Sequence, residues 1–441
     1  MNNRTQDTTP TLLSSPLFLA LFRSLFLFLF LFLNLKGVSS GAQTPNDTLL
    51  IEHLLKQDPA SFQKLLAHAG KYRIQIIYTQ IDRDANNVPS FKEYTYRLNR
   101  QQYFYCASLV KLPCSALALE KLQELQIKGL DRNSTMLTDS SGPCQKKTLL
   151  DTSAADGSPS MAQYIRRMLL VSDNNAYSRC YEFLGPEYIH TRLTAKGYPD
   201  ALIMQRFDPA CNTGDNTQTN PVDFYDRSGK LLYHQPAAVC TIPLVHPLSK
   251  PVVGKAYIDG KENKVMEPKD FSHSNFLPLA DITHLLRSVV FPEATATEQQ
   301  FQISPDDRLF MLKYMSMLPR ESDSPNYKNK TYYDSYKKYL IYGDSKAPIQ
   351  ADTLRIFNIV GQSYGFVTDV AYVCDFKNKV EFMLSAVIYA NEDEVINDNK
   401  YEYTTVALPF LANLGKSIYR YDKKRKRPRK PILEAFRFRY N

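Results

Sequence analysis

The 441-residue chain lacks tryptophan, and it lacks the cysteine and histidine spacings that mark common metal and redox sites. No Cys-x-x-Cys pair occurs, which argues against a zinc ribbon and against a thioredoxin-type centre. The seven histidines show neither a His-Glu-x-x-His nor a His-x-His spacing, so nothing in the sequence supports a metal-dependent hydrolase. We therefore expect no metal ion and no other cofactor.

Most of the chain has no excess of positive or negative charge. The net charge is +9, but residues 420–441 hold ten lysines and arginines against two acidic residues. The remainder is nearly neutral, which disfavours nucleic-acid binding. With 44% hydrophobic and 22% charged residues, the chain can bury a core. We expect 421–441 to be a solvated, disordered basic tail, with contact to an anionic membrane surface as the alternative.

The N-terminal region has the pattern of a secretory signal. Residues 17–35 are almost entirely Leu and Phe, interrupted by Arg23, and the small residues of 38–42 follow them. A short apolar run before a small-residue site predicts cleavage near Ala42, so that 1–42 is a signal peptide and the protein is periplasmic or secreted. An uncleaved membrane anchor is the alternative, although the run is short for a full span.

Export would place the cysteines in a compartment that permits disulfides. An odd number of cysteines leaves at least one unpaired in a monomer. Cys106 is a candidate for a disulfide that braces the segment after it, and a buried free thiol is the alternative. The seven cysteines are Cys106, Cys114, Cys144, Cys180, Cys211, Cys240 and Cys374.

Apolar periodicity predicts the order of the elements. The expected helices are 48–69, 108–128, 161–184, 279–290, 306–317 and 404–419, and the expected strands are 72–81, 91–98, 355–359, 365–374 and 380–389. Strands at both ends with helices between them predict an α+β fold, in which one antiparallel sheet built from both chain ends packs against a helical half. We expect one domain over 43–420, with 228–276 as an insertion that turns at Asp259-Gly260.

A serine and a lysine three residues apart, Ser108 and Lys111, are the first candidates for chemistry. On a helix this spacing puts both side chains on one face. A serine hydroxyl becomes a nucleophile when a neighbouring group takes its proton, and a lysine whose charge is disfavoured by burial can be that group. The backbone N–H groups at the beginning of such a helix can bind an oxyanion.

Spacing alone does not single out this pair, because it recurs elsewhere in the chain. Ser61 and Lys64 share it, and so do Ser335 and Lys338. At these two places we expect surface side chains without a catalytic role. The setting of Ser108 differs, since it follows the apolar segment 104–107 and precedes a second apolar stretch.

The second candidate is the triplet Ser172-Asp173-Asn174, which interrupts the apolar helical run 168–171 and occurs once in the chain. Polar residues at this point can form the second wall of a cleft that contains Ser108. The alternative is a plain helix junction, in which Ser172 or Asp173 caps a helix.

Ser-x-x-Lys followed by Ser-Asp-Asn resembles the signature of class A β-lactamases and penicillin-binding transpeptidases. The resemblance extends over roughly 60–420 and implies the β-lactamase/transpeptidase-like fold. It also implies a monomer and a β-lactam or peptidoglycan-like substrate. Within this family pattern Ser108 is the acyl-accepting nucleophile, and Lys111 is its base or base partner. Ser172 relays a proton towards the leaving nitrogen, and Asn174 positions the substrate amide and contacts Lys111.

The resemblance assigns a third motif, Lys-Thr-Gly, to a strand that lines the cleft. The matching residues are Ile359-Val360-Gly361, followed by Gln362. The implied oxyanion donors are the backbone N–H groups of Ser108 and Gln362, with Gly361 beside them. Isoleucine replaces the lysine that helps to bind the substrate carboxylate, and we do not expect Arg355, four residues earlier, to take its place.

The segment that should carry the glutamate for deacylation, 205–221, contains no glutamate. Asp208 and Asp215 are its two carboxylates, and both are candidates for the deacylation base. Asp is one methylene shorter than Glu, and the sequence Arg206-Phe207-Asp208 fits a structural aspartate at the beginning of the loop better. Acylation is therefore better supported than release of the acyl group.

Three functions remain open at this point. The first is a class A-type serine hydrolase that acts on β-lactams or a related amide. The second is an envelope peptidase or esterase, which requires neither of the missing residues. The third is a degenerate homologue that binds a cell-wall ligand or partner without turnover.

Overall fold

The computed structural model describes residues 46–141, 146–208 and 215–440. The predicted signal peptide, 1–42, lies outside the described residues, and so do Cys144 and Cys211. Across the described ranges, no helix has the length and apolar character that a membrane crossing requires.

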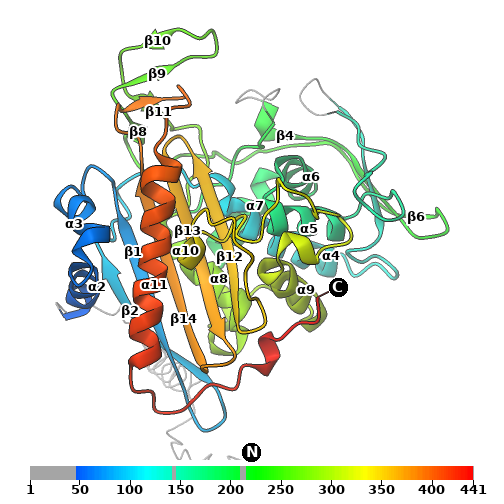
Figure 1. The fold of residues 1–441 in the computed structure, drawn as a ribbon. Coiled ribbons are helices and arrows are strands. Elements are labelled where there is room, and N and C mark those ends of the chain that lie inside the picture. Colours follow the sequence, from blue (N-terminus) through cyan, green and yellow to red (C-terminus); the bar gives the residue numbers. More distant parts are fainter. Residues whose placement is uncertain (1–45, 142–145, 209–214, 441) are drawn as a thin grey trace, which may run out of the picture. The chain divides into compact units, whose positions relative to one another are not determined.

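The core of the fold is a five-stranded antiparallel sheet made from both ends of the chain (Figure 1). Its strands, in spatial order, are β12 (Leu354–Ser363), β13 (Phe366–Asp375), β14 (Val380–Tyr389), β1 (Gln75–Arg83) and β2 (Pro89–Tyr96). The two ends meet where Gln75 of β1 pairs with Val387 of β14. The predicted α+β fold with one sheet from both ends is thus confirmed.

Side chains alternate between the two faces of this sheet, as a strand requires. Ile76 and Tyr78 pack with the helices at the two ends of the chain, whereas Ile77 and Ile81 pack with the central helices. Figure 1 shows α11 lying along the first face. That face is covered by α2 (Asn46–Lys56), α3 (Pro59–Ala67) and α11 (Leu408–Lys424), and the other by α8 (Leu279–Val290).

The helical half of the fold is arranged around α4, whose side chains are buried along most of its length. The helix contacts α5, α6, α7, α8 and α9. It begins at Lys111 rather than Ser108, because a 3-10 turn, Ala107–Val110, precedes it. The bounds are α4 (Lys111–Glu124), α5 (Met161–Val171), α6 (Asn174–Leu184), α7 (Pro186–Ala195) and α9 (Pro305–Ser316).

Two predicted helices are each divided in two. The expected helix 48–69 breaks before Pro59, whose ring cannot continue a helix but suits its first position, and Asp58 caps the second helix by accepting from Ser61 N at 3.3 Å. The expected helix 161–184 breaks at Ser172-Asp173, where α5 ends and α6 begins.

The segment 228–276 consists of short strands outside the main sheet. The predicted turn at Asp259-Gly260 is confirmed, because β9 and β10 pair antiparallel on either side of it. The strands are β6 (Leu231–Gln235), β7 (Ala238–Val239), β8 (Val252–Val253), β9 (Ala256–Ile258), β10 (Lys264–Val265) and β11 (Lys269–Asp270). The remaining elements are β3 (Thr135–Thr138), β4 (Gln218–Thr219), β5 (Val222–Tyr225), α10 (Tyr339–Tyr342) and β15 (Val395–Ile396).

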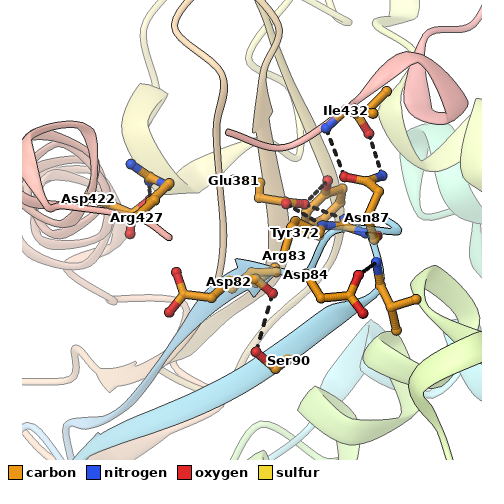
Figure 2. A network of polar contacts seen from close by, with 12 residues as sticks. Asp82, Arg83, Asp84, Asn87, Ser90, Tyr372, Glu381, Asp422, Arg427 and Ile432 are labelled. Atoms are coloured by element: carbon orange, nitrogen blue, oxygen red, sulfur yellow. Dashed lines mark hydrogen bonds and ion pairs between the residues drawn. The ribbon is translucent and has the colours of Figure 1, made fainter. Parts of the chain in front are cut away.

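The basic C-terminal segment is ordered through residue 440, so the prediction of a disordered tail is wrong. Its first residues, 421–424, continue α11. Arg425 and Arg427 both form ion pairs with the fully buried Asp422, and Arg425 also pairs with Asp82. In Figure 2 the side chain of Asn87 exchanges two hydrogen bonds, of 3.0 and 2.9 Å, with the backbone of Ile432.

Apolar side chains hold the last part of this segment on the sheet. Leu433 is fully buried and Phe436 is 6% exposed. The Phe436 ring contacts the rings of Phe291, Phe357 and Tyr372, with centroids 4.9–5.8 Å apart. The density of Lys and Arg along the segment concealed this apolar spacing in the sequence.

We expect Phe436→Ala to lower the free energy of unfolding by about 3–5 kcal/mol, the usual cost of removing a buried aromatic ring. Ile432→Ala is the matched control, because Ile432 is 64% exposed, and it should change stability by no more than about 0.5 kcal/mol. Urea unfolding measures both. Equal, small effects would mean that the segment is not part of the folded core.

Candidate active site

The amine of Lys111 lies at the centre of the predicted site. Its Nζ is 2.8 Å from Ser108 Oγ, 3.0 Å from Ser172 Oγ, 2.6 Å from the Ser172 carbonyl oxygen and 2.7 Å from Asn174 Oδ1. An ammonium has three hydrogens, and a neutral amine has two hydrogens and one lone pair, so either form can make three of these four contacts at once. Only the neutral amine has a lone pair that can accept a proton from a hydroxyl group.

Burial favours this neutral form. The side chain of Lys111 has no solvent-exposed surface. Loss of hydration lowers the pKa of Lys111 well below its ordinary value, and the charge of Lys337 lowers it further, against the opposing effect of Asp173. The amine is therefore prepared to accept a proton, as a general base must be.

Left-handed backbone positions bring the two motifs to this amine. Ala107, immediately before Ser108, has φ +45°, and Ser172 has φ +62° where it ends α5. Such conformations cost non-glycine residues free energy and are held only by their surroundings. At Ser172 the conformation presents both the carbonyl and the hydroxyl to Lys111.

Asp173 holds the turn instead of facing the amine. Its carboxylate accepts from the backbone N–H of Ala176 at 2.9 Å, which caps α6. Arg167 bridges Asp173 and the buried Asp151, at 2.9 and 2.7 Å. The capping alternative is thus correct for Asp173, while Ser172 and Asn174 contact Lys111.

The third wall of the site is the edge strand β12, which takes in Gly361 and Gln362. A Cβ atom on Gly361 would overlap with the carbonyl oxygen of Cys106, so only glycine allows this close approach to the turn that carries Ser108. Because β12 is at the edge of the sheet, every second N–H of the strand points away from β13. Gln362 is half-buried, and its Oε1 accepts from Tyr339 Oη at 2.6 Å.

Neither Ile359 nor Arg355 supplies a cation to the site. Ile359 is 3% exposed and belongs to the core that β12 shares with the central helices. Arg355 forms two hydrogen bonds of 2.7 Å with Glu321, which agrees with the expectation that it does not replace the missing lysine.

The expectation for Ser335 and Lys338 is wrong. Both residues are buried, and Lys338 Nζ donates to Asn358 Oδ1 at 2.7 Å and to the carbonyl oxygen of Met315. Ser335 instead donates to the Ser345 carbonyl. Spacing alone cannot reveal burial, and these two side chains do not contact each other.

The loop that begins at Gln205 approaches the site through Phe207. The Phe207 ring centroid is 5.3 Å from Lys111 Nζ and 4.6 Å from the Tyr177 ring. Arg206 anchors the loop through an ion pair of 2.6 Å with the buried Glu182. Asp208 follows directly and is half-buried. Asp215 begins a 3-10 turn, Asp215–Thr217, and its side chain lies outside the described part.

Two site residues, Lys337 and Phe207, were not predicted from the sequence. Lys337 is half-buried, and its Nζ lies 3.1 Å from Tyr339 Oη. Its sequence neighbours give no catalytic pattern. The close packing of Phe207 against Lys111 is likewise a contact between distant segments, which no local spacing indicates.

The segment 228–276 contributes to the packing beside Ser108. Phe271, near its end, packs against the rings of Tyr105 and Tyr364, with centroids 5.7 and 5.4 Å apart. Tyr105 is three residues before Ser108, and Tyr364 follows β12. This segment therefore supports both sides of the close contact at Gly361.

The cysteine beside the nucleophile is not in a disulfide. Cys106 is a buried free thiol, so the bracing alternative is wrong. Burial raises the pKa of its thiol, which keeps the group protonated and unreactive. The described cysteines that are free are Cys106, Cys114, Cys180, Cys240 and Cys374.

Comparison with known proteins gives one family match. Residues 60–232 match the model of the beta-lactamase enzyme family. This range contains the motifs at Ser108 and Ser172, whereas Gly361 and Gln362 lie beyond it. No curated protein matches the sequence.

Solved structures similar to this chain share little sequence with it. A class A beta-lactamase from Clostridium kluyveri is 14% identical over 83% of this chain and 98% of that one, with a TM-score of 0.45. A beta-lactamase from Burkholderia phymatum is 13% identical over 86% and 98%, with a TM-score of 0.43. One from Xanthomonas campestris is 11% identical over 84% and 96%, also with a TM-score of 0.43.

Gly361→Ala should destabilise the protein by about 1–3 kcal/mol, because the added Cβ forces the backbone of Cys106 aside. Gly260→Ala is the control, since a Cβ there meets nothing within 4 Å, and we expect a change of at most about 0.5 kcal/mol. Thermal unfolding of both variants measures the difference. An unperturbed Gly361→Ala protein would contradict the close approach of β12 to the turn.

Proposed function

Since residues 60–232 match the model of the beta-lactamase enzyme family, we propose that the chain is an exported class A-type serine hydrolase. It forms an acyl-enzyme on Ser108 and hydrolyses β-lactams or a related amide. The observation that carries the proposal is the buried amine of Lys111, which lies 2.8 Å from Ser108 Oγ.

In the acylation step, neutral Lys111 takes the proton of Ser108 as Oγ attacks the substrate carbonyl carbon. A C–O bond forms, and the carbonyl π electrons move to the oxygen. When the C–N bond breaks, the leaving nitrogen takes a proton from Ser172 Oγ. That hydroxyl is restored by Lys111, whose Nζ lies 3.0 Å from it. Asn174 accepts a hydrogen bond from the amine and holds it in place.

The developing oxyanion is stabilised by the backbone N–H groups of Ser108 and Gln362. Preorganised donors of this kind supply a large part of catalysis in acyl transfer. The support for this assignment is the contact between Gly361 and Cys106, which brings β12 against the turn that carries the nucleophile.

For release of the acyl group, we assign Asp208 as the base that activates water. Of the two candidate carboxylates, Asp208 directly follows Phe207, whose ring lies beside Lys111. An aspartate reaches less far than a glutamate, and a misplacement of about 1 Å can cost on the order of 100-fold in rate. We therefore expect release to be slower than acylation.

Mass spectrometry after incubation with a penicillin and, separately, with a fluorophosphonate tests the proposal. Both reagents should add to Ser108, and Ser108→Ala should abolish both adducts. The penicillin adduct should clear slowly in the wild type and persist in Asp208→Asn.

The outcomes separate the three functions. Labelling by the fluorophosphonate alone would favour the envelope peptidase or esterase. Absence of both adducts would leave only the binding homologue without turnover. A penicillin adduct that never clears from the wild type would indicate a penicillin-binding function and would remove the role of Asp208.

The pH dependence of fluorophosphonate labelling should report Lys111. Labelling requires the neutral amine, so the rate should rise with pH through the lowered pKa of Lys111 and reach its plateau well below pH 10.5, the ordinary lysine value. In Lys111→Met the labelling rate should no longer rise with pH in this range, and it should be about 100- to 10,000-fold lower. The exposed Lys64 provides the control Lys64→Met, which should keep the wild-type profile. A rise with pH that survives in Lys111→Met would belong to another group.

A further inference from the structure

Lys337 is a largely buried cation without an acidic partner. Among the residues that the structure describes, no aspartate or glutamate forms an ion pair with it. Its Nζ has one hydrogen-bond partner there, Tyr339 Oη at 3.1 Å. The rings of Tyr336 and Tyr339 lie 5.1 and 5.7 Å from the amine and enclose the side chain. A buried charge without compensation is costly, so the fold keeps this cation at a cost.

The next residue, Lys338, is a buried lysine whose amine is compensated by hydrogen bonds. Lys338 Nζ donates to two oxygens, and one of them belongs to Asn358, which in turn donates to the buried Asp369 at 2.8 Å. Lys337 has φ +61°, and its carbonyl is held by Asn358 Nδ2 at 2.9 Å. Asn358 thus contacts both lysines, through the amine of Lys338 and the carbonyl of Lys337, but among the described residues the amine of Lys337 receives no such compensation.

The amine of Lys337 is connected to the candidate active site through Tyr339. Its partner Tyr339 donates to Gln362 Oε1 at 2.6 Å, and Gln362 follows the glycine that touches the turn of Ser108. The two amines are close enough that the charge of Lys337 disfavours that of Lys111. Burial lowers the pKa of Lys337 to about 8, so the group is still mainly protonated at neutral pH.

We propose that Lys337 binds a carboxylate of the substrate and supplies the positive charge that Ile359 cannot supply. This inference rests on the proposed function. An ammonium has three donors, and Tyr339 occupies one. In the described part of the chain the other two have no acceptor and are available to an anion, and Lys337 is not fully buried, so a ligand can reach it. A carboxylate in this position would gain charge-assisted hydrogen bonds in a partly desolvated site.

Two kinds of substrate carry such a group near the scissile bond. One is a β-lactam with a ring carboxylate, and the other is a peptide or depsipeptide that ends in a free carboxylate. The chemistry that Lys337 recognises is the same in both. The two sources are therefore distinguished by the probes in the experiment.

The test compares acylation of Ser108 in the mature chain by probes with and without the carboxylate. The probes are a penicillin and its methyl ester, and a thioester depsipeptide and its C-terminal methyl ester. Mass spectrometry gives the rate constant of each, and the readout is the ratio of free acid to ester. Effects that Lys337 exerts through the pKa of Lys111 are common to both members of a pair and cancel in this ratio.

Lys337→Met should lower the ratio by about 10- to 100-fold for the preferred pair, the usual loss of a hydrogen bond to a charged group. Lys337→Arg should restore most of it, because the charge returns. The control is Lys330→Met, which removes an exposed lysine from the same segment and should leave the ratio unchanged.

A ratio that is the same in Lys337→Met and the wild type, with Ser108 still acylated, would overturn this inference and leave the proposed function standing. Equal losses of rate for acid and ester would also overturn it, because Lys337 would then act only through the pKa of Lys111. Absence of any adduct from the four probes and from a fluorophosphonate would overturn the proposed function, and this inference with it.

Discussion

The amine of Lys111, shielded from water and surrounded by four oxygen atoms, is the point on which the candidate active site depends. Its burial makes the charged form unfavourable, and the neutral amine has the lone pair needed to receive a proton from Ser108. Every neighbouring element contributes to this arrangement. The 3-10 turn supplies Ser108, the junction of α5 and α6 supplies Ser172 and Asn174, and the Phe207 ring lies beside the amine.

The position of β12 at the edge of the sheet leaves backbone N–H groups unpaired next to the candidate active site. An interior strand would have both sets of N–H groups paired, whereas β12 has one neighbour and leaves alternate N–H groups available. Gly361 allows this edge to touch the backbone of Cys106, so the donors and the nucleophile are held by one contact. The same edge carries Gln362, through which Tyr339 connects Lys337 to the site.

Agreement between sequence and structure is best where the signal is local. The strand 380–389 and the helix 279–290 have the predicted bounds, because apolar periodicity depends on neighbours along the chain. The pair Ser335 and Lys338 shows the limit of such signals. It has the spacing of Ser108 and Lys111, but its side chains are buried away from each other. The prediction of a disordered C-terminal tail was wrong for a different reason. The arginines appeared solvated in the sequence, but in the fold they are neutralised by buried ion pairs.

By itself, the sequence determined the α+β fold, the two motifs and the absence of a lysine at Ile359. These are properties of residue type and spacing along the chain. Only the tertiary structure decided that Lys111 is fully buried, that Phe207 lies beside it, and that Lys337 is linked to the site through Tyr339 and forms an ion pair with none of the described acidic residues. These properties depend on contacts between segments far apart in the chain, and desolvation and charge pairing act through space, so no spacing along the chain encodes them.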